Sequence, residues 1–142
     1  MQDIENVILF QIDKTGKVAK SYSQREFDRI GLGITVEQWI VLKIIEEYEA
    51  LSQRELATKS LRDPASITRT IDILEKKNYV VRNSIPDNRR QYHLSLTTAG
   101  KRFVAEHLAV IKAHRLRSVH GFTKEELSQL SGYLSRIQQN MK

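Results

Sequence analysis

The stretch that decides the fold covers residues 52–77 and reads SQRELATKSLRDPASITRTIDILEKK. It contains two helix starts in quick succession. At the first, Ser52 is followed three positions later by Glu55, the capping-box arrangement in which each side chain bonds the other residue's backbone N–H. At the second, Asp63 precedes Pro64; Asp accepts a bond from an orphan N–H of the first turn, and Pro has no N–H to lose. The stretch therefore predicts two short helices joined by a tight turn.

A cationic hairpin follows the second helix. Residues 80–96 read VVRNSIPDNRRQYHLSL, in which two β-prone segments flank a tip that carries Pro86, Asp87 and the adjacent arginines Arg89 and Arg90. Two short helices followed by a ribbon describe a winged helix-turn-helix, whose second helix enters the DNA major groove while the ribbon reaches the minor groove or the backbone. A guanidinium suits a narrow A·T-rich minor groove, where the negative potential is enhanced. We expect a mainly α fold with a small β-ribbon wing.

The second of the two helices has an apolar and a polar face. Ile67, Ile71 and Leu74 recur at helical spacing and should face the core. The opposite face carries Arg69 and Asp72. We expect Asp72 to pair with a lysine or arginine one turn away on the same helix, and not to read cytosine.

Helical segments precede and follow this lobe. Loosely periodic apolar residues predict a long first helix over residues 4–29. A capping box at Thr35 and Gln38 predicts the next helix. After the hairpin, Thr97 can cap a long helix over residues 98–120. The chain thus reads as almost entirely helical outside the wing.

The last helix carries a narrow apolar seam with spacings of three and four, as in a coiled coil. The seam consists of Leu127, Leu130, Leu134, Ile137 and Met141. Because the stripes of the first and the last two helices exceed what one small lobe can cover, we expect a homodimer. We divide the single domain 1–142 into a winged-helix lobe at 35–97 and a helical dimerisation region at 1–34 and 98–142.

Composition narrows the classes of function. The 142 residues carry a formal charge of +6, which favours a polyanionic partner such as double-stranded DNA; a merely basic soluble protein is the alternative. Zero cysteines exclude disulfides, thiolate catalysis and cysteine-based zinc sites. No apolar run approaches the roughly 20 residues that span a bilayer, and the N-terminus lacks the basic start of a signal peptide. We expect a cytoplasmic protein with no membrane partner.

The sequence shows no enzyme signature. A nucleophile elbow, a glycine-rich phosphate loop and an HExxH motif are all missing, so we expect neither an enzyme nor a cofactor. His107 and His114 share one predicted helix but lie about 10 Å apart along its axis, too far to bind one metal ion within a single chain. We expect no metal site; a site formed across a dimer is the alternative.

Three segments resemble the MarR family of bacterial transcriptional regulators: LGITVEQWIVL, LSQRELATKSLRDPASITRTIDILEKKNYVVR and DNRRQYHLSLTTAG. They stand in the family's order and spacing. The resemblance implies an obligate dimer with intertwined terminal helices, whose two winged lobes grip a palindromic operator, more often as a repressor than as an activator. It also implies that Ser66, Thr68 and Arg69 face bases or nearby phosphates, and that Arg89 or Arg90 is the wing-tip arginine.

Plainer alternatives stand beside these assignments. Surface arginines usually belong to a solvated face, and Ser66 and Thr68 can act as local caps in a helix first turn. The family often has Asp directly before the paired arginines, where Asn88 stands here. Which of Arg89 and Arg90 enters the groove is therefore open.

The resemblance further implies regulation by a small aromatic or phenolic ligand, bound between the dimer helices and the DNA-binding lobe. Tyr22, Phe27 and Trp39 are the candidates to line that cleft, with plain core packing as the alternative. The alternative function is a winged-helix protein-interaction module that does not read DNA. Basic residues on both the second helix and the wing tip argue for DNA.

Overall fold

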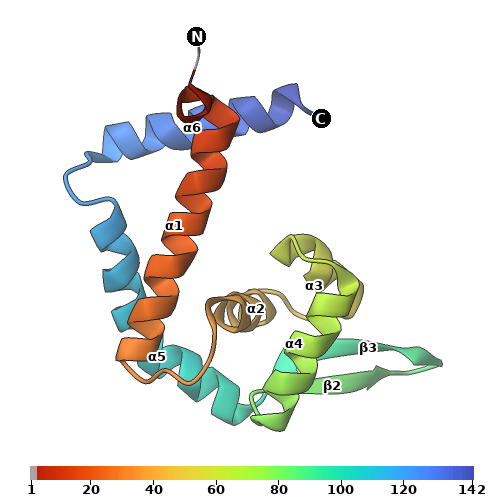
Figure 1. The fold of residues 1–142 in the computed structure, drawn as a ribbon. Coiled ribbons are helices and arrows are strands. Elements are labelled where there is room, and N and C mark those ends of the chain that lie inside the picture. The colour runs from red at the N-terminus through yellow and green to blue at the C-terminus, as the bar shows by residue number, and fades with distance from the viewer. Residues whose placement is uncertain (1–2) are drawn as a thin grey trace. The chain divides into compact units, whose positions relative to one another are not determined.

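The computed structural model describes residues 3–142, with the exception of the Arg89 side chain. The chain divides into two compact units, Met1–Val110 and Ile111–Lys142. The elements that lie wholly in the first unit (Figure 1) are η1 (Ile4–Asn6, a 3-10 turn), α1 (Ile8–Arg29), α2 (Val36–Glu47), β1 (Leu51–Ser52), α3 (Gln53–Ser60), α4 (Pro64–Lys76), β2 (Val80–Ile85) and β3 (Asn88–Leu96). Helix α5 (Thr98–Ser118) begins in the first unit and ends in the second, which also holds α6 (Lys124–Asn140).

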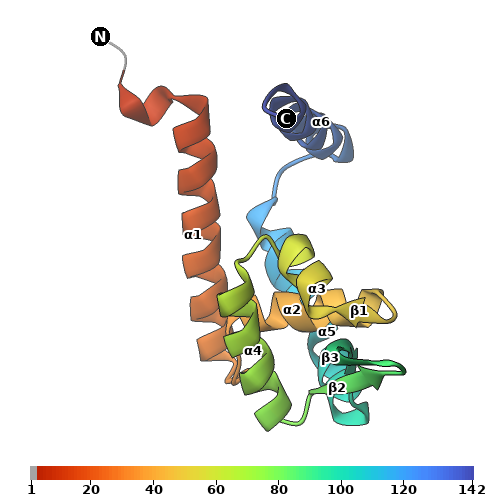
Figure 2. The same ribbon diagram turned by 90° about the vertical axis from the view of Figure 1, so that its right-hand side faces the viewer.

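The strands form one antiparallel sheet in the order β1-β3-β2 (Figure 2). Strands β2 and β3 are the predicted ribbon, paired from Val80 opposite Leu96 at its base out toward the tip. The short β1 was not expected, and it places Leu51 opposite Leu94. The mainly α fold with a small β wing is confirmed, and β1 joins the base of the wing to the start of α3.

The core of the first unit lies between α2, α3, α4 and the sheet. Fully buried side chains come from each of these elements, among them Leu42, Leu56, Ile67, Leu74 and Leu94. Burying an aliphatic side chain of this size stabilises the fold by about 1.5 to 3 kcal/mol relative to leaving it exposed. The three elements of the helix-turn-helix and wing are therefore held against one another by a shared apolar centre.

Helix α1 begins one turn later than the sequence suggested. Ile4–Asn6 form a 3-10 turn, and Val7 is extended at φ −73° and ψ 125°, so the α-helix starts only at Ile8. The apolar residues along most of its length are exposed, Ile8 at 56% and Val18 at 60%, and Phe27 near its end is buried. Both ribbon views show the N-terminal part of α1 projecting away from the lobe.

In the second unit, α6 begins at a capping box formed by Thr123 and Glu126. The Thr123 hydroxyl accepts a bond from the Glu126 backbone N–H, and the Glu126 carboxylate accepts one from the Thr123 N–H. Helix α5 ends at Ser118, two residues before the predicted end. Leu130 and Tyr133 of α6 and its C-cap residue Met141 are exposed, at 46%, 56% and 61%.

A glycine permits close contact where the wing returns to the helical part of the chain. The Tyr79 carbonyl accepts a bond from the Thr97 N–H, and Thr97 Oγ1 donates to the Asn78 carbonyl at 2.6 Å. A Cβ atom on Gly100 would lie 2.2 Å from the Tyr79 carbonyl oxygen, a backbone atom that cannot swing aside. Asn78, the residue before Tyr79, has φ 64°, a left-handed conformation that Asn adopts more readily than most other non-glycine residues.

We expect Gly100→Ala to destabilise the protein by about 1 to 3 kcal/mol, because the first turn of α5 must move off Tyr79. Gly16→Ala is the matched control: a Cβ there meets nothing within 4 Å, and Ala in a helix interior should stabilise by about 0.5 to 1 kcal/mol. Denaturant unfolding at one fixed protein concentration measures both. Equal effects of the two substitutions would contradict the close contact.

Candidate nucleic-acid interface

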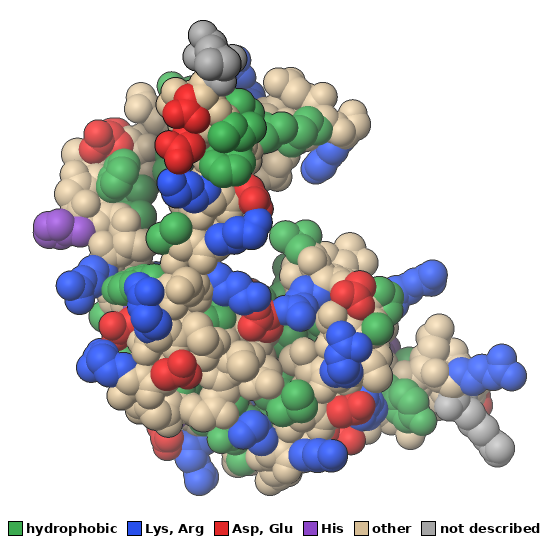
Figure 3. All heavy atoms as spheres, in the orientation of Figure 1, with side chains coloured by type: hydrophobic (Ala, Val, Ile, Leu, Met, Phe, Trp, Pro, Cys, Tyr) green, Lys and Arg blue, Asp and Glu red, His purple; other side chains and the backbone are tan. Residues whose placement is uncertain are grey.

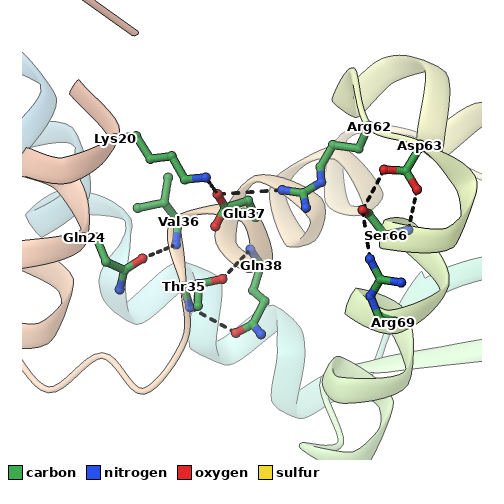
Figure 4. Close-up of polar contacts among 10 residues, drawn as sticks. All are labelled: Lys20, Gln24, Thr35, Val36, Glu37, Gln38, Arg62, Asp63, Ser66 and Arg69. Carbon is green, nitrogen blue, oxygen red and sulfur yellow. Dashed lines mark hydrogen bonds and ion pairs between the residues drawn. The ribbon is translucent and has the colours of Figure 1, made fainter. Parts of the chain in front are cut away.

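The start of α4 is organised by one carboxylate (Figure 4). Asp63 Oδ1 accepts a bond from the Ser66 backbone N–H at 2.9 Å, and Asp63 Oδ2 accepts one from the Ser66 hydroxyl at 2.7 Å. The Ser66 hydroxyl oxygen in turn accepts a longer bond, 3.3 Å, from the Arg69 guanidinium. Asp63, Ser66 and Arg69 thus form one polar chain on the exposed first turn of the helix.

The hydrogen bonds from Ser66 and the nearby charge of Arg69 lower the pKa of Asp63 below its ordinary value. The backbone bond from Ser66 is the largest cause, followed by its side-chain bond, and the charge of Arg69 acts in the same direction. The carboxylate is therefore ionised at neutral pH and sits at the positive end of the α4 dipole, where negative charge is favourable.

Helix α4 has the two faces that its sequence indicates. Ile67, Ile71 and Leu74 are fully buried, and Thr70 with them is nearly so. The exposed face carries Arg69, and the space-filling view shows Lys and Arg side chains over α4 and the projecting wing, with acids between them (Figure 3). The arrangement presents a mixed but basic surface along one side of a helix and a neighbouring ribbon.

Thr68 and Ser66 are both engaged in local bonds. Thr68 Oγ1 accepts a bond from Gln53 Nε2 of α3 at 2.7 Å and donates to the Pro64 carbonyl at 3.0 Å. Together with the Ser66 cap, these bonds are the local role that small hydroxyls often take. Contact of Ser66 or Thr68 with DNA stays a prediction.

The wing is fastened to α4 by Arg82, a residue that the sequence reading did not single out. Its guanidinium binds Asp72 at 2.8 Å and Glu75 at 3.0 Å. The prediction that Asp72 pairs within its own helix was wrong, because its partner lies in β2. The sequence held a signal: side chains two apart in a strand share a face, so Arg82 lies on the same side as buried Val80.

The pKa of Arg82 is raised although partial burial of the guanidinium opposes the shift; the hydrogen bond to Asp72 and the charges of Glu75 and Asp72 outweigh that burial. Arg82 is therefore charged when it pairs with Asp72 and Glu75 of α4, and it holds the wing against that helix.

The wing tip is a tight turn with a left-handed residue. Asp87 has φ 66°, and Asn88 Oδ1 accepts a bond from the Arg90 backbone N–H at 3.2 Å. Asn88 thus braces the turn through the backbone. Arg90 is exposed, whereas the Arg89 side chain lies outside the described part of the structure. The choice between Arg89 and Arg90 as the groove-entering residue remains a prediction.

The three aromatic candidates for a ligand cleft differ in exposure. Phe27 and Trp39 are 4% and 5% exposed and pack in the core, whereas Tyr22 is half-buried. The Trp39 ring lies 6.4 Å from that of Phe103 of α5. Phe27 and Trp39 are therefore core residues in this conformation, and their contact with a ligand stays a prediction.

Among the described residues, no group of three His, Asp or Glu side chains gathers as a metal site would require. Nor does the described part of the chain contain a helix long and apolar enough to cross a bilayer. His107 Nδ1 lies 2.8 Å from the Phe103 carbonyl oxygen one turn earlier, which accounts for one of its two ring nitrogens.

Comparisons with known proteins agree with this geometry. Residues 34–92, which span α2 to most of β3, match the model of the MarR family. A MarR-family transcriptional regulator from Rhodococcus sp. RHA1 is 25% identical, with 96% of each chain covered and a TM-score of 0.84. The chain thus contains a MarR-family domain over residues 34–92, and a solved MarR-family regulator shares its fold over nearly the whole length. The MarR-family relatives of solved structure are winged-helix transcriptional regulators, as the sequence resemblance implied.

Two further MarR-like structures are informative. CouR from Rhodococcus jostii RHA1, solved with p-coumaroyl-CoA bound, is 25% identical, with coverage of 96% of this chain and 95% of that one and a TM-score of 0.82. S. aureus MepR, solved in complex with DNA, is 18% identical, with coverage of 94% and 98% and a TM-score of 0.82. At that identity, the likeness to MepR establishes a shared fold.

The lowered pKa of Asp63 predicts the pH dependence of its cap. Its contribution to folding is present above the ordinary aspartate pKa of the unfolded chain and is lost as pH falls through the lower folded value. Asn is an equally good N-cap but does not titrate. The stability of the native protein relative to Asp63→Asn, measured by denaturant unfolding, should therefore decline toward acid pH. A difference that stays constant from pH 7 down to about pH 2 would contradict the assignment.

Proposed function

We propose that this MarR-family protein is a homodimeric, sequence-specific DNA-binding repressor of a near-palindromic operator. Helix α4, the recognition helix, enters the major groove through Ser66, Thr68 and Arg69, and the wing reaches the minor groove through Arg89 or Arg90. Two-fold symmetry would place the recognition helices in successive major grooves, roughly 34 Å apart. Binding to chromosomal DNA would place the protein in the cytoplasm.

The observation that best supports this proposal is the division of α4 into a face buried in the core and an exposed polar face. Ile67, Ile71 and Leu74 fix the helix against the lobe, so Arg69 is held outward on a rigid support. Arg82 fastens the wing to that helix through Asp72. The geometry supports groove recognition because a rigid helix and an adjacent ribbon point basic groups in a fixed relation. MepR, a structural relative, was solved on DNA.

Exposed apolar helices support the dimer. Helix α1 leaves Ile8 and Val18 more than half exposed, and α6 exposes Tyr133 to a similar degree. Large apolar side chains that recur along a helix in this way usually mark a protein interface. A second copy of the chain would cover them, as the proposed dimerisation regions 1–34 and 98–142 require.

Selection of bound sequences from a random DNA pool tests the proposal and should yield a near-palindromic consensus. On that operator, Arg69→Ala should weaken binding by about 1 to 3 kcal/mol if Arg69 contacts a base. The loss should exceed that on unrelated DNA. Titrations by fluorescence anisotropy at several salt concentrations separate the contribution of base contacts from that of phosphate contacts, because phosphate contacts dominate the dependence of affinity on salt.

Arg102→Ala is the charge-matched control, because Arg102 is exposed and belongs to α5, outside both α4 and the strands of the wing. It should change operator binding only slightly. The DNA-reading assignment fails if Arg69→Ala and the paired Arg89→Ala, Arg90→Ala variant both bind as the native protein does. A pool that yields no consensus would favour the protein-interaction module.

We also propose that a small aromatic ligand releases the operator. The relative CouR was solved with p-coumaroyl-CoA, and a ligand with different affinity for two dimer geometries would shift DNA affinity. Half-buried Tyr22 offers the accessible contact, whereas Phe27 and Trp39 require local opening to be reached. The coupling needs no cysteine, which the chain lacks.

The single tryptophan makes this ligand proposal measurable. Trp39 is the only Trp in the chain, so intrinsic fluorescence reports one buried position. We expect p-coumaroyl-CoA or a simpler phenolic acid to change that fluorescence and to release operator DNA over the same concentration range. Tyr22→Ala should shift the fluorescence titration and the DNA-release titration by the same factor in ligand concentration. Release of DNA with no change in fluorescence would place the ligand elsewhere.

A further inference from the structure

We infer that Glu37 is a positioning residue that fixes the angle between α1 and the recognition helix α4. Its consequence for operator spacing rests on the proposed function, whereas its effect on the geometry of a single chain does not. One carboxylate oxygen of Glu37 faces basic groups from two other elements.

Glu37 lies in the first turn of α2, between α1 and the α3–α4 turn (Figure 4). Its Oε1 atom pairs with Lys20 Nζ of α1 and lies 3.7 Å from Arg62 Nη1 of that turn. Arg62 directly precedes Asp63, the residue that caps α4. One carboxylate thereby connects the projecting helix to the start of the recognition helix.

The carboxylate is sheltered and charged. The Glu37 and Arg62 side chains are 22% and 31% exposed, against 63% for Lys20. Burial alone would raise the pKa of Glu37, but the bond from Lys20, the backbone N–H of Glu37 itself and the charges of Lys20 and Arg62 lower it. Glu37 therefore holds both cations at neutral pH.

The position of Lys20 along α1 gives this contact leverage. Near the end of α1, Phe27 is buried and Gln24 Oε1 accepts a bond from the Val36 N–H at 3.1 Å. Lys20 lies about 10 Å farther along the helix than Phe27. A contact far from the buried end of a helix restricts changes in the helix angle more than a contact close to that end. The Lys20–Glu37 pair therefore controls the angle of α1.

The Lys20–Glu37 pair contributes little to folding stability, because Lys20 is exposed, solvent screens the pair and ordering two long side chains costs entropy. Glu37→Gln, which keeps the shape and removes the charge, should leave the melting temperature almost unchanged. Its effect should appear in the distribution of helix angles.

The test uses the absence of cysteine from the chain. We place spin labels at two exposed positions, Lys14→Cys of α1 and Lys76→Cys of α4. Double electron–electron resonance between the labels reports the distance between the two helices. Excess unlabelled protein limits the measurement to distances within one chain. We expect Glu37→Gln to broaden or shift the distribution, whereas Glu46→Gln should not. Glu46 is the matched control because its 2.6 Å partner, Lys43, lies on the same helix.

An unchanged distribution in Glu37→Gln overturns the inference, as does equal broadening in Glu46→Gln. If Glu37→Gln fails to fold, Lys20→Gln replaces it, and the same broadening is expected from that exposed position.

Operator binding provides the second readout. The native protein should prefer one half-site spacing over spacings changed by one base pair, and Glu37→Gln should lose at least about fivefold in affinity at the preferred spacing. The difference in affinity between the preferred spacing and the other spacings should therefore become smaller. Binding to an isolated half-site should stay the same. A loss that is equal at every spacing identifies a general structural role and overturns the inference. If the native protein binds no palindrome, the proposed function fails, and the distance measurement still decides whether Glu37 sets the angle.

Discussion

The burial of the apolar stripe of α4 is the constraint on which the rest of the molecule depends. Ile67, Ile71 and Leu74 have no exposure at all, so α4 cannot rotate about its axis without uncovering aliphatic surface. That fixed rotation decides where Arg69 points and where Asp72 meets Arg82 of the wing. A helix held only by polar contacts would offer its outer face in many orientations, and the discrimination between bases depends on a single one.

The parts of the fold that could be predicted from the sequence are those set by neighbours in the chain. Capping at Thr35, Ser52 and Asp63 is decided within four residues, and all three helices begin where those residues indicated. Strand β1 and the ion pairs of Arg82 depend on contacts between residues far apart in sequence, such as Leu51 with Leu94. A two-residue strand has too little length for an alternating pattern, so only the folded chain reveals it.

The candidate site divides in the same way. The exposure of Arg69 follows from helical periodicity, and the structure agrees. Hydroxyl groups are ambiguous in sequence because one Ser or Thr can cap, bridge or contact a ligand; Thr68 bridges to Gln53 in the unbound chain. Glu37 was invisible as a site residue, since an acid in the first turn of a helix is ordinary until Lys20 and Arg62 are seen to converge on it. Convergence of three elements is a tertiary property.

The bonds of Thr97 to Asn78 and Tyr79 have a consequence for how this protein can change. They tie the end of the hairpin to its beginning, so the whole excursion of the wing leaves and returns at one point of the scaffold. Residues can be added to or removed from the tip without altering the path of α5. The tip of the wing is thus a replaceable part: its length and charge can change, or be redesigned, while the base of the ribbon and the helices keep their packing.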